Sequence, residues 1–188
     1  MPSRLVTTAL AFLALATPLR AEPVPESERV PIDLRRTTLV VRDIDASLAF
    51  YRDALGLEVI YDNLIRTPRS AETDEQADRS LRLVFLRAND DYIGIVGLLE
   101  YRKPRKPAAH QGLEPFSTGS IVLLFNAEDL DTAFARARNV PGVRVLSEPE
   151  LTQYPSYDGS GTISVNVSVL TDPDGFVVEL NQLLEDLH

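Results

Sequence analysis

One order of hydrophobic patterns occurs twice in this chain of 188 residues. Each copy begins with a short β-rich segment, continues with apolar residues at helical spacing, and ends with three strand-like segments. The copies span about residues 35–103 and 118–185, and a proline-containing linker separates them. A sheet with one apolar face must cover that face with another layer. The repeat therefore predicts an α+β domain at residues 35–185, in which two βαβββ modules with curved mixed sheets enclose a cavity.

The helix of the first copy has a defined start and end. Asp43 precedes it, and an aspartate in this position accepts hydrogen bonds from the first free N–H groups of a helix. Apolar residues recur at helical spacing as far as Leu55, and Gly56 suits the left-handed conformation that ends many helices. The strands of this copy are expected at residues 37–41, 57–61, 81–87 and 92–101, and the polar residues 66–80 are expected to form an exposed loop.

The second copy carries the same signals. Asn126 or Asp129 begins its helix, and Pro141-Gly142 ends it. Apolar and polar residues alternate from Ile163 to Val169, as expected for a strand with one buried face. The sequence Asp172-Pro173-Asp174-Gly175 predicts a tight turn, because glycine readily adopts a positive φ. The strands are expected at residues 120–125, 143–146, 162–171 and 176–183.

The composition excludes several kinds of chemistry. There is no cysteine, which rules out a disulfide, a thiolate nucleophile and a cysteine metal site. His110 and His188 are the two histidines, so a multi-histidine metal centre within one chain is nearly excluded. The formal net charge of −9 argues against nucleic acid and anionic membranes as partners.

Residues 1–21 differ from the rest of the chain and predict a secretory signal peptide. Arg4 is followed by an uncharged apolar run, and Ala21 provides a small residue before Glu22. Cleavage after Ala16 is an alternative, and an N-terminal membrane anchor is the competing interpretation, although the run is short for a bilayer. Residues 22–34 are then an extended leader. We expect a secreted or periplasmic protein that is not inserted in a membrane after processing.

Two segments carry a family resemblance. They are Asp43-Ile44-Asp45-Ala46-Ser47-Leu48-Ala49-Phe50-Tyr51-Arg52-Asp53-Ala54-Leu55-Gly56-Leu57 and Asp172-Pro173-Asp174-Gly175-Phe176-Val177-Val178-Glu179-Leu180. Together they resemble the vicinal oxygen chelate superfamily, which includes glyoxalase I, extradiol dioxygenases and bleomycin-resistance proteins. The resemblance covers about residues 36–183 and implies the same paired-module fold around a cavity.

The resemblance also assigns four metal-ligand positions, which hold histidine or glutamate in metal-dependent members. Here these positions are Arg36, Gly97, Ser120 and Glu179. Glu179 alone is a suitable donor, and a transition metal needs three or four donors. We therefore predict no metal and no other cofactor. We also hypothesise that Arg36 and Glu179 form an ion pair in the cavity, with the guanidinium where a metal would lie.

Strand alternation extends the candidate site beyond these positions. His110, in the linker, is either a solvated side chain or part of a weak metal site with Glu179 and Glu100. Each candidate also has a structural interpretation. Glu179 could be a carboxylate with a purely structural partner, and Arg36 could be exposed at a strand edge. Tyr154 and Tyr157 could belong to an ordinary connection between strands. The candidate wall and lid residues are Arg36, Thr38, Val40, Gly97, Ser120, Val122, Glu179 and Asn181, with Tyr154 and Tyr157 in a loop that closes over the ligand.

The favoured function is metal-independent binding of a small organic molecule, and Arg36 would attract an anionic one; this is what the likeness to the bleomycin-resistance branch implies. The alternative is a lyase, isomerase or dioxygenase of the same superfamily, in which Glu179 acts as a general base at a degenerate metal site. A third interpretation is a protein-interaction module with a collapsed cavity. The family likeness further implies a homodimer.

Overall fold

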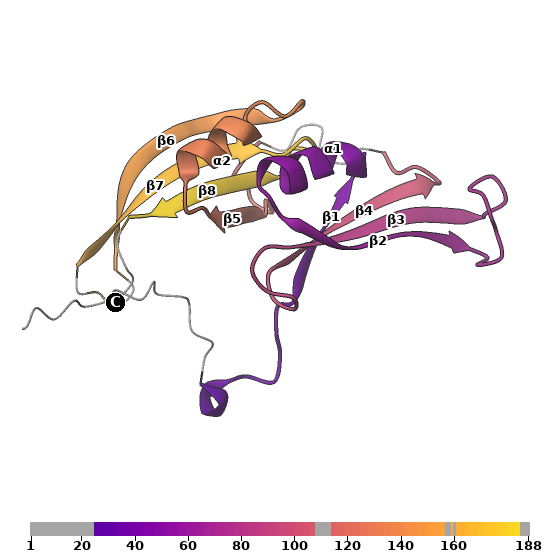
Figure 1. The fold of residues 1–188 in the computed structure, drawn as a ribbon, viewed down its shortest axis with the longest axis horizontal. Coiled ribbons are helices and arrows are strands. Elements are labelled where there is room, and N and C mark those ends of the chain that lie inside the picture. Colours follow the sequence, from indigo (N-terminus) through magenta and orange to yellow (C-terminus); the bar gives the residue numbers. More distant parts are fainter. Residues whose placement is uncertain (1–24, 108–113, 157–158, 160, 185–188) are drawn as a thin grey trace, which may run out of the picture.

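The computed structural model describes residues 25–107, 114–156, 159 and 161–184, and they form two modules of the same design (Figure 1). A 3₁₀ turn at Glu26–Glu28 precedes them. The first module contains β1 (Arg36–Val41), α1 (Ile44–Leu48) with a π-helical continuation (Ala49–Ala54), β2 (Glu58–Thr67), β3 (Arg79–Arg87) and β4 (Ile95–Lys103). The second contains β5 (Val122–Asn126), α2 (Leu130–Ala137), β6 (Arg144–Pro155), β7 (Thr162–Thr171) and β8 (Val177–Leu183). The predicted α+β fold and its repeat are confirmed.

The two sheets have the same strand order. They run β1-β4-β3-β2 and β5-β8-β7-β6. The first and last strands of each module are parallel, because the chain crosses over between them, whereas the hairpin-connected strands are antiparallel. In this register Thr38 lies opposite Gly97, and Leu124 lies opposite Glu179. No helix among the described residues is long and apolar enough to cross a membrane.

Some strand boundaries differ from those expected from the sequence. β4 begins at Ile95 instead of residue 92, and β5 begins at Val122 instead of residue 120. Gly94 and Gly119 have positive φ values of 71° and 97°, so each places a turn just before its strand. β6 continues to Pro155 because register shifts at residues 145–150 accommodate the proline within this stretch.

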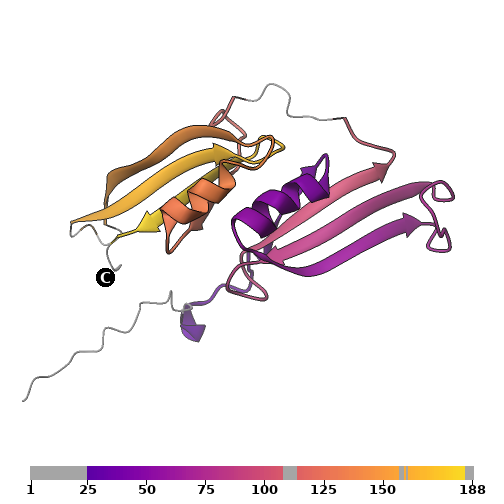
Figure 2. The same cartoon turned by 45° about the horizontal axis from the view of Figure 1, so that its top comes forward.

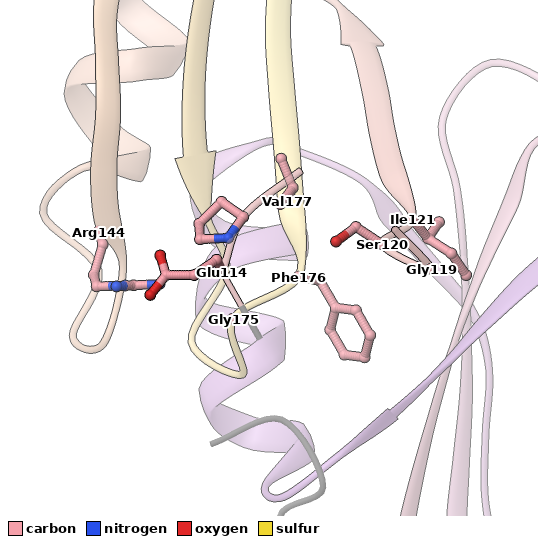
Figure 3. Close-up of a pocket in the computed structure, with 9 residues that line it drawn as sticks. Glu114, Gly119, Ser120, Ile121, Arg144, Gly175, Phe176 and Val177 are labelled. Carbon is pink, nitrogen blue, oxygen red and sulfur yellow. The ribbon is translucent and has the colours of Figure 1, made fainter. Parts of the chain in front are cut away.

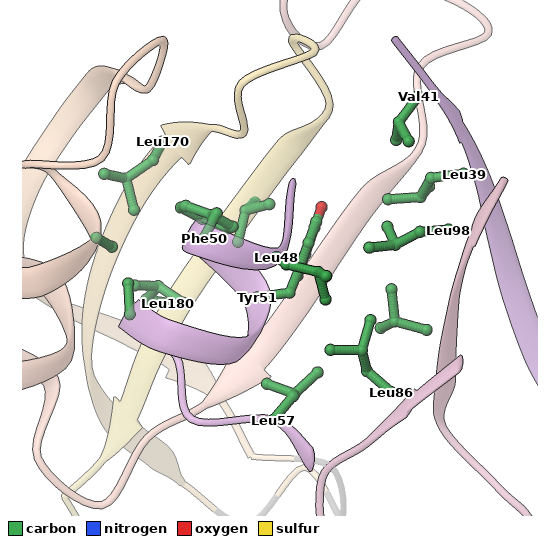
Figure 4. Close-up of a cluster of buried hydrophobic side chains, with 14 of the residues drawn as sticks. Leu39, Val41, Leu48, Phe50, Tyr51, Leu57, Leu86, Leu98, Leu170 and Leu180 are labelled. Atoms are coloured by element: carbon green, nitrogen blue, oxygen red, sulfur yellow. The ribbon is translucent and has the colours of Figure 1, made fainter. Parts of the chain in front are cut away.

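The helix of each module covers one side of its sheet, and both helices lie side by side between the sheets (Figure 2). The guanidinium Nε of Arg136 in α2 donates to the carbonyl oxygen of Ala54 at 2.8 Å. One apolar cluster contains side chains from both modules, as Figure 4 shows for Phe50, Tyr51, Leu170 and Leu180. The modules therefore share a single core.

The π-helical continuation of α1 brings two consecutive aromatic residues into this core. The N–H of Leu55 donates to the carbonyl of Phe50, five residues earlier, at 3.0 Å. Phe50 and Tyr51 are both fully buried, and their rings pack edge to face at 5.0 Å. Gly56 then ends the helix with φ of 84°, as the sequence indicated.

Tyr51 links the two modules through a buried hydrogen bond. Its hydroxyl donates to Asp172 Oδ2 at 3.0 Å, and Asp172 Oδ1 accepts the N–H groups of Asp174 and Phe176, each at 2.9 Å. Beside this contact, Arg42 Nε forms an ion pair with Asp174 Oδ1 at 2.6 Å. We call the contacts of Arg42 and Tyr51 with Asp172 and Asp174 the intermodule lock. It joins the two sequence motifs that carry the family resemblance.

Burial raises the pKa of Asp172 to about 6, against the hydrogen bonds that favour its ionised form. In the unfolded chain this carboxyl ionises near its ordinary value of 3.8. Between these two values the folded state binds more protons than the unfolded state, so stability falls as the pH rises.

We predict that Asp172 by itself lowers the free energy of unfolding by about 2–3 kcal/mol between about pH 4 and pH 6, whereas carboxyls with a lowered pKa, such as Asp74, raise it as the pH rises. Urea denaturation across this range measures the slope. The variant Asp172→Asn should lose this component, because its amide does not titrate. An unchanged slope in Asp172→Asn would contradict the assignment. Tyr51→Phe removes one hydrogen bond that favours the ionised carboxyl, so its cost of about 1–2 kcal/mol should be larger at the upper end of the pH range than at the lower end.

Candidate functional site

Each sheet has a second side, away from the helices, which we call its open face. Residues paired across strands share a face, so the register assigns the residues to it. On the first sheet the open face carries Arg36, Thr38, Val40, Tyr61, Phe85, Gly97 and Leu99. On the second sheet it carries Val122, Leu124, Tyr154, Val167, Val169, Glu179 and Asn181.

The open faces are not closed over by the described part of the chain. Val40 is 48% exposed, Val122 is 38% exposed and Leu124 is 59% exposed. The sequence predicted an enclosed cavity between the modules. The helices pack with the shared core on the other side of each sheet, so the open faces are the sides left for such a cavity.

Arg36 lies on the first open face and is held by its own module. Its Nε donates to Thr38 Oγ1 at 3.0 Å, and its guanidinium lies over the Phe85 ring at 4.0 Å. Phe85 in turn stacks on Tyr61 at 4.7 Å. The hypothesised ion pair with Glu179 is not among the ion pairs of the described residues. Arg36 and Glu179 belong to different sheets, and Arg36 contacts Thr38 and Phe85 of its own sheet instead.

Gly97 lies beneath this arginine. A Cβ atom added at Gly97 would come within 2.7 Å of Thr38 Oγ1 and 3.1 Å of Arg36 Cδ. Both distances are shorter than ordinary van der Waals contact, so a side chain at residue 97 would displace Thr38 and Arg36. The three residues therefore form one packed unit at this end of the sheet.

The internal repeat relates positions in the two modules. The side chains of Asp43 and Asp129 cap α1 and α2, and the residues seven positions earlier are Arg36 and Val122. Thr38 and Leu124 each lie five positions before the capping aspartate of their module. Their partners on the neighbouring strand are Gly97 and Glu179, so these two residues are equivalent as well. The position that the sequence analysis assigned to Ser120 therefore falls on Val122. Ser120 precedes the strand, where its N–H donates to Ser117 in a turn.

The resulting set of four positions does not fit a divalent transition metal. Arg36, Gly97, Val122 and Glu179 supply one carboxylate and a permanent cation, whereas such sites need three or four N, O or S donors. No group of three or more histidine, aspartate or glutamate residues within the described ranges is arranged to hold a metal ion. Glu100 also lies on the helix side of its sheet, where it accepts the N–H of Ile44. It is therefore on the wrong side to join Glu179, and His110 is outside the described residues.

Several polar side-chain atoms of the second open face have no partner among the described residues, including Oγ1 of Thr171. The carboxylate of Glu179 appears in no hydrogen bond or ion pair of the described residues. Asn181, two residues further along β8, is 8% exposed, and its Oδ1 is buried without a hydrogen-bond partner. Unsatisfied buried oxygens are rare, and a ligand or a bound water accounts for many of them. The roles of Glu179 as a base and of both residues in binding remain predictions.

Ser120 contributes to a separate small pocket at the end of the second sheet (Figure 3). The pocket has a volume of about 100 Å³, smaller than sites for drug-sized ligands. Glu114, Arg144, Phe176 and Val177 also line it. The sequence analysis did not identify this pocket, because its walls come from three segments that only the fold brings together.

The tyrosines that were expected to form a lid have different positions. Tyr154 belongs to strand β6, where it pairs with Ile163 and is 43% exposed on the open face. It is therefore part of the sheet and not of a loop, and Tyr157 lies outside the described residues. Sequence reasoning also missed Tyr61 and Phe85, although the alternation of Leu81, Leu83 and Phe85 was a signal for one shared face.

Comparison with known proteins gives consistent results. A family model described as the Glyoxalase/Bleomycin resistance protein/Dioxygenase superfamily matches residues 33–180. A search of curated proteins found no match.

Several solved structures are similar to this chain. A glyoxalase family protein from Bacillus cereus has a TM-score of 0.64 at 14% identity, covering 86% of this chain and 100% of that chain. Glyoxalase I from Leishmania major, described as trypanothione-dependent, has a TM-score of 0.52 at 20% identity, covering 80% of this chain and 86% of that one. An antibiotic-binding protein from a Streptomyces species has a TM-score of 0.49 at 19% identity, and the match covers 82% of this chain and 99% of that chain. At these identities the likeness is one of fold.

We predict that Gly97→Ala lowers the free energy of unfolding by about 1–3 kcal/mol, because the new methyl group overpacks against Thr38 and Arg36. Chemical denaturation measures this loss. The loss should be smaller in a Thr38→Ala background, since that change removes the nearest atom. Gly161→Ala is the control, because a Cβ there meets no atom within 4 Å. Equal losses at both glycines would contradict the packing described for Arg36.

Proposed function

This chain belongs to the glyoxalase/bleomycin resistance protein/dioxygenase superfamily, and we propose that it binds a small organic anion on its open faces without a metal. The observation that carries the proposal is the guanidinium of Arg36, which lies over Phe85 and is fixed by Thr38. It occupies one of the positions that the family resemblance assigns to a metal ligand. A permanent cation there repels a metal ion and attracts a carboxylate.

The contacts of Arg36 favour recognition of an anion. Its Nε is held by the Thr38 hydroxyl, and the stacking on Phe85 limits the rotation of the guanidinium plane. None of the described carboxylates is within ion-pair distance of Arg36. The terminal nitrogens are therefore available to a ligand, and a planar guanidinium can donate two parallel hydrogen bonds to a carboxylate or phosphate. Because the side chain is already ordered, binding costs less conformational entropy.

The surroundings of Arg36 favour an organic ligand over an inorganic ion. The Phe85 and Tyr61 rings provide apolar surface next to the cation, and Gly97 leaves the backbone of β4 uncovered apart from Arg36 and Thr38. The second sheet adds Glu179 and Asn181 as acceptors, which suit hydroxyl or N–H groups of a ligand. Ligand sites commonly combine apolar walls with a few polar groups in this way.

We predict that a thermal-shift screen of small carboxylates and phosphates will find ligands that raise the melting temperature by about 5–10 °C near saturation. Arg36→Gln should abolish the shift. Arg35→Gln is a matched control, because it removes the same charge from the next residue, whose guanidinium lies over Tyr92 instead. A shift that survives in Arg36→Gln and disappears in Arg35→Gln would contradict the proposed site.

The metal-free character has its own test. Elemental analysis of the purified protein should find no stoichiometric zinc, nickel, manganese or iron. A stoichiometric metal that is lost in Glu179→Gln would refute metal-independent binding and favour an enzyme with a degenerate metal site, in which Glu179 serves as ligand or base.

Export is the second part of the proposal, and it is supported by the charged start and apolar run of residues 1–21. We predict that the protein recovered from the envelope or medium of an expressing bacterium begins at Glu22 or at Thr17, as intact mass measurement would show. An unprocessed chain retained in the cytoplasm would contradict export.

A further inference from the structure

The small pocket at the end of the second sheet, which we call the end pocket, is bordered by two opposite charges (Figure 3). Arg144 stands at the start of β6, and Glu114 belongs to the linker between the modules. Neither side chain forms an ion pair, with the other or with any further residue of the described ranges. Figure 3 shows both on one side of the pocket and Ser120 on the other. Both charges are therefore available to a molecule in the pocket.

The sheet places a further polar group at the base of the end pocket. Thr171 pairs with Arg144 on one side and with Val177 on the other, so the three side chains form a row on the open face. Arg144 and Val177 line the pocket, and Thr171 lies between them. Thr171 is fully buried, and its Oγ1 has no hydrogen-bond partner among the described residues. A bound molecule or a water commonly satisfies a buried hydroxyl of this kind.

The pair of charges selects against simple ions. An anion that approaches Arg144 is repelled by Glu114, and a cation that approaches Glu114 is repelled by Arg144. A molecule that carries both charges satisfies both residues, and its carboxylate can accept two parallel hydrogen bonds from the guanidinium. A direct contact between the two side chains would be a solvent-exposed ion pair, which contributes little to stability. A zwitterionic ligand can therefore replace such a contact at small cost.

The rest of the lining limits the size of the ligand. The volume of about 100 Å³ corresponds to about three water molecules at about 30 Å³ each. Phe176 and Val177 provide an apolar wall, and Val177 is only 3% exposed. Gly119 and Gly175 also border the pocket and add no side chains to it. The space therefore suits a molecule with a short side chain and excludes one with an aromatic ring.

We propose that the end pocket binds a small amino acid as its zwitterion. The carboxylate pairs with Arg144, the ammonium group pairs with Glu114, and the short side chain packs against Phe176 and Val177. The hydroxyl group of Ser120 is a further hydrogen-bonding partner in the lining. This site is separate from the anion site proposed above, whose guanidinium belongs to the first sheet.

Isothermal titration calorimetry of the full chain with L-alanine tests this proposal. L-alanine should bind saturably, with one molecule per chain. Propionate and ethylamine each keep the carbon skeleton and one of the two charges, so each should bind at least about tenfold more weakly. L-phenylalanine keeps both charges but exceeds the volume of the pocket, and it should show the same loss.

Substitutions in the lining locate the ligand. Arg144→Gln and Glu114→Gln should each weaken the binding of L-alanine at least about tenfold, because each removes one of the two charges. Ser120→Leu keeps both charges and should abolish binding, because the larger side chain fills the pocket. Arg138→Gln is the matched control, since it removes another exposed arginine of the same module, which pairs with Glu148 instead. The affinity should be unchanged in this variant.

Melting temperatures measured without ligand show that each variant is folded, as expected for changes at the surface. The proposal is overturned if saturable binding is absent up to about 10 mM L-alanine. It is also overturned if propionate binds as tightly as L-alanine, or if binding persists in Ser120→Leu. Binding that is lost in Arg36→Gln and kept in Arg144→Gln would place the ligand at the proposed anion site, with the same consequence. Because separate arginines are tested, either proposed site can fail without the other.

Discussion

The intermodule lock and the core beside it determine how this molecule is organised. Tyr51 is fully buried and donates to Asp172, so the helix of the first module is tied to the turn before the last strand of the second. The ion pair of Arg42 with Asp174 holds the same turn from the end of β1. Because the apolar sides of both helices and both sheets meet in one cluster, neither module would have a complete core alone.

This arrangement decides which surfaces remain for function. The core covers the helix sides of the sheets. The open faces carry polar side-chain groups that have no partner among the described residues. Arg36, Thr38 and Gly97 depend on one another, since the arginine lies over the space that a side chain at residue 97 would fill. The three residues therefore form one packed unit beside the Phe85 ring.

Sequence reasoning succeeded where the cause is local. Asp43 caps its helix, and Gly56 and Gly175 adopt positive φ, because a few neighbouring residues decide these features. It failed where the cause is long-range. Ser120 was placed on a strand that begins at Val122, Tyr154 was placed in a loop although it lies in β6, and Arg36 was paired with a carboxylate of the other sheet. Strand register and the choice of partner depend on contacts between distant residues, which a single sequence does not specify.

The sequence by itself determined the order of elements, the internal repeat and the superfamily, because all of these follow from residue types and their spacing. The tertiary structure decided which side of each sheet is buried, that Val122 is the counterpart of Arg36, and that Gly97 is covered by the arginine. It also decided that Asp172 is a buried carboxyl with a pKa of about 6 and not an exposed turn residue. Strand register within each module sets the positions of Val122 and Gly97, and packing between modules sets the environment of Asp172, whose partner Tyr51 is more than a hundred positions away.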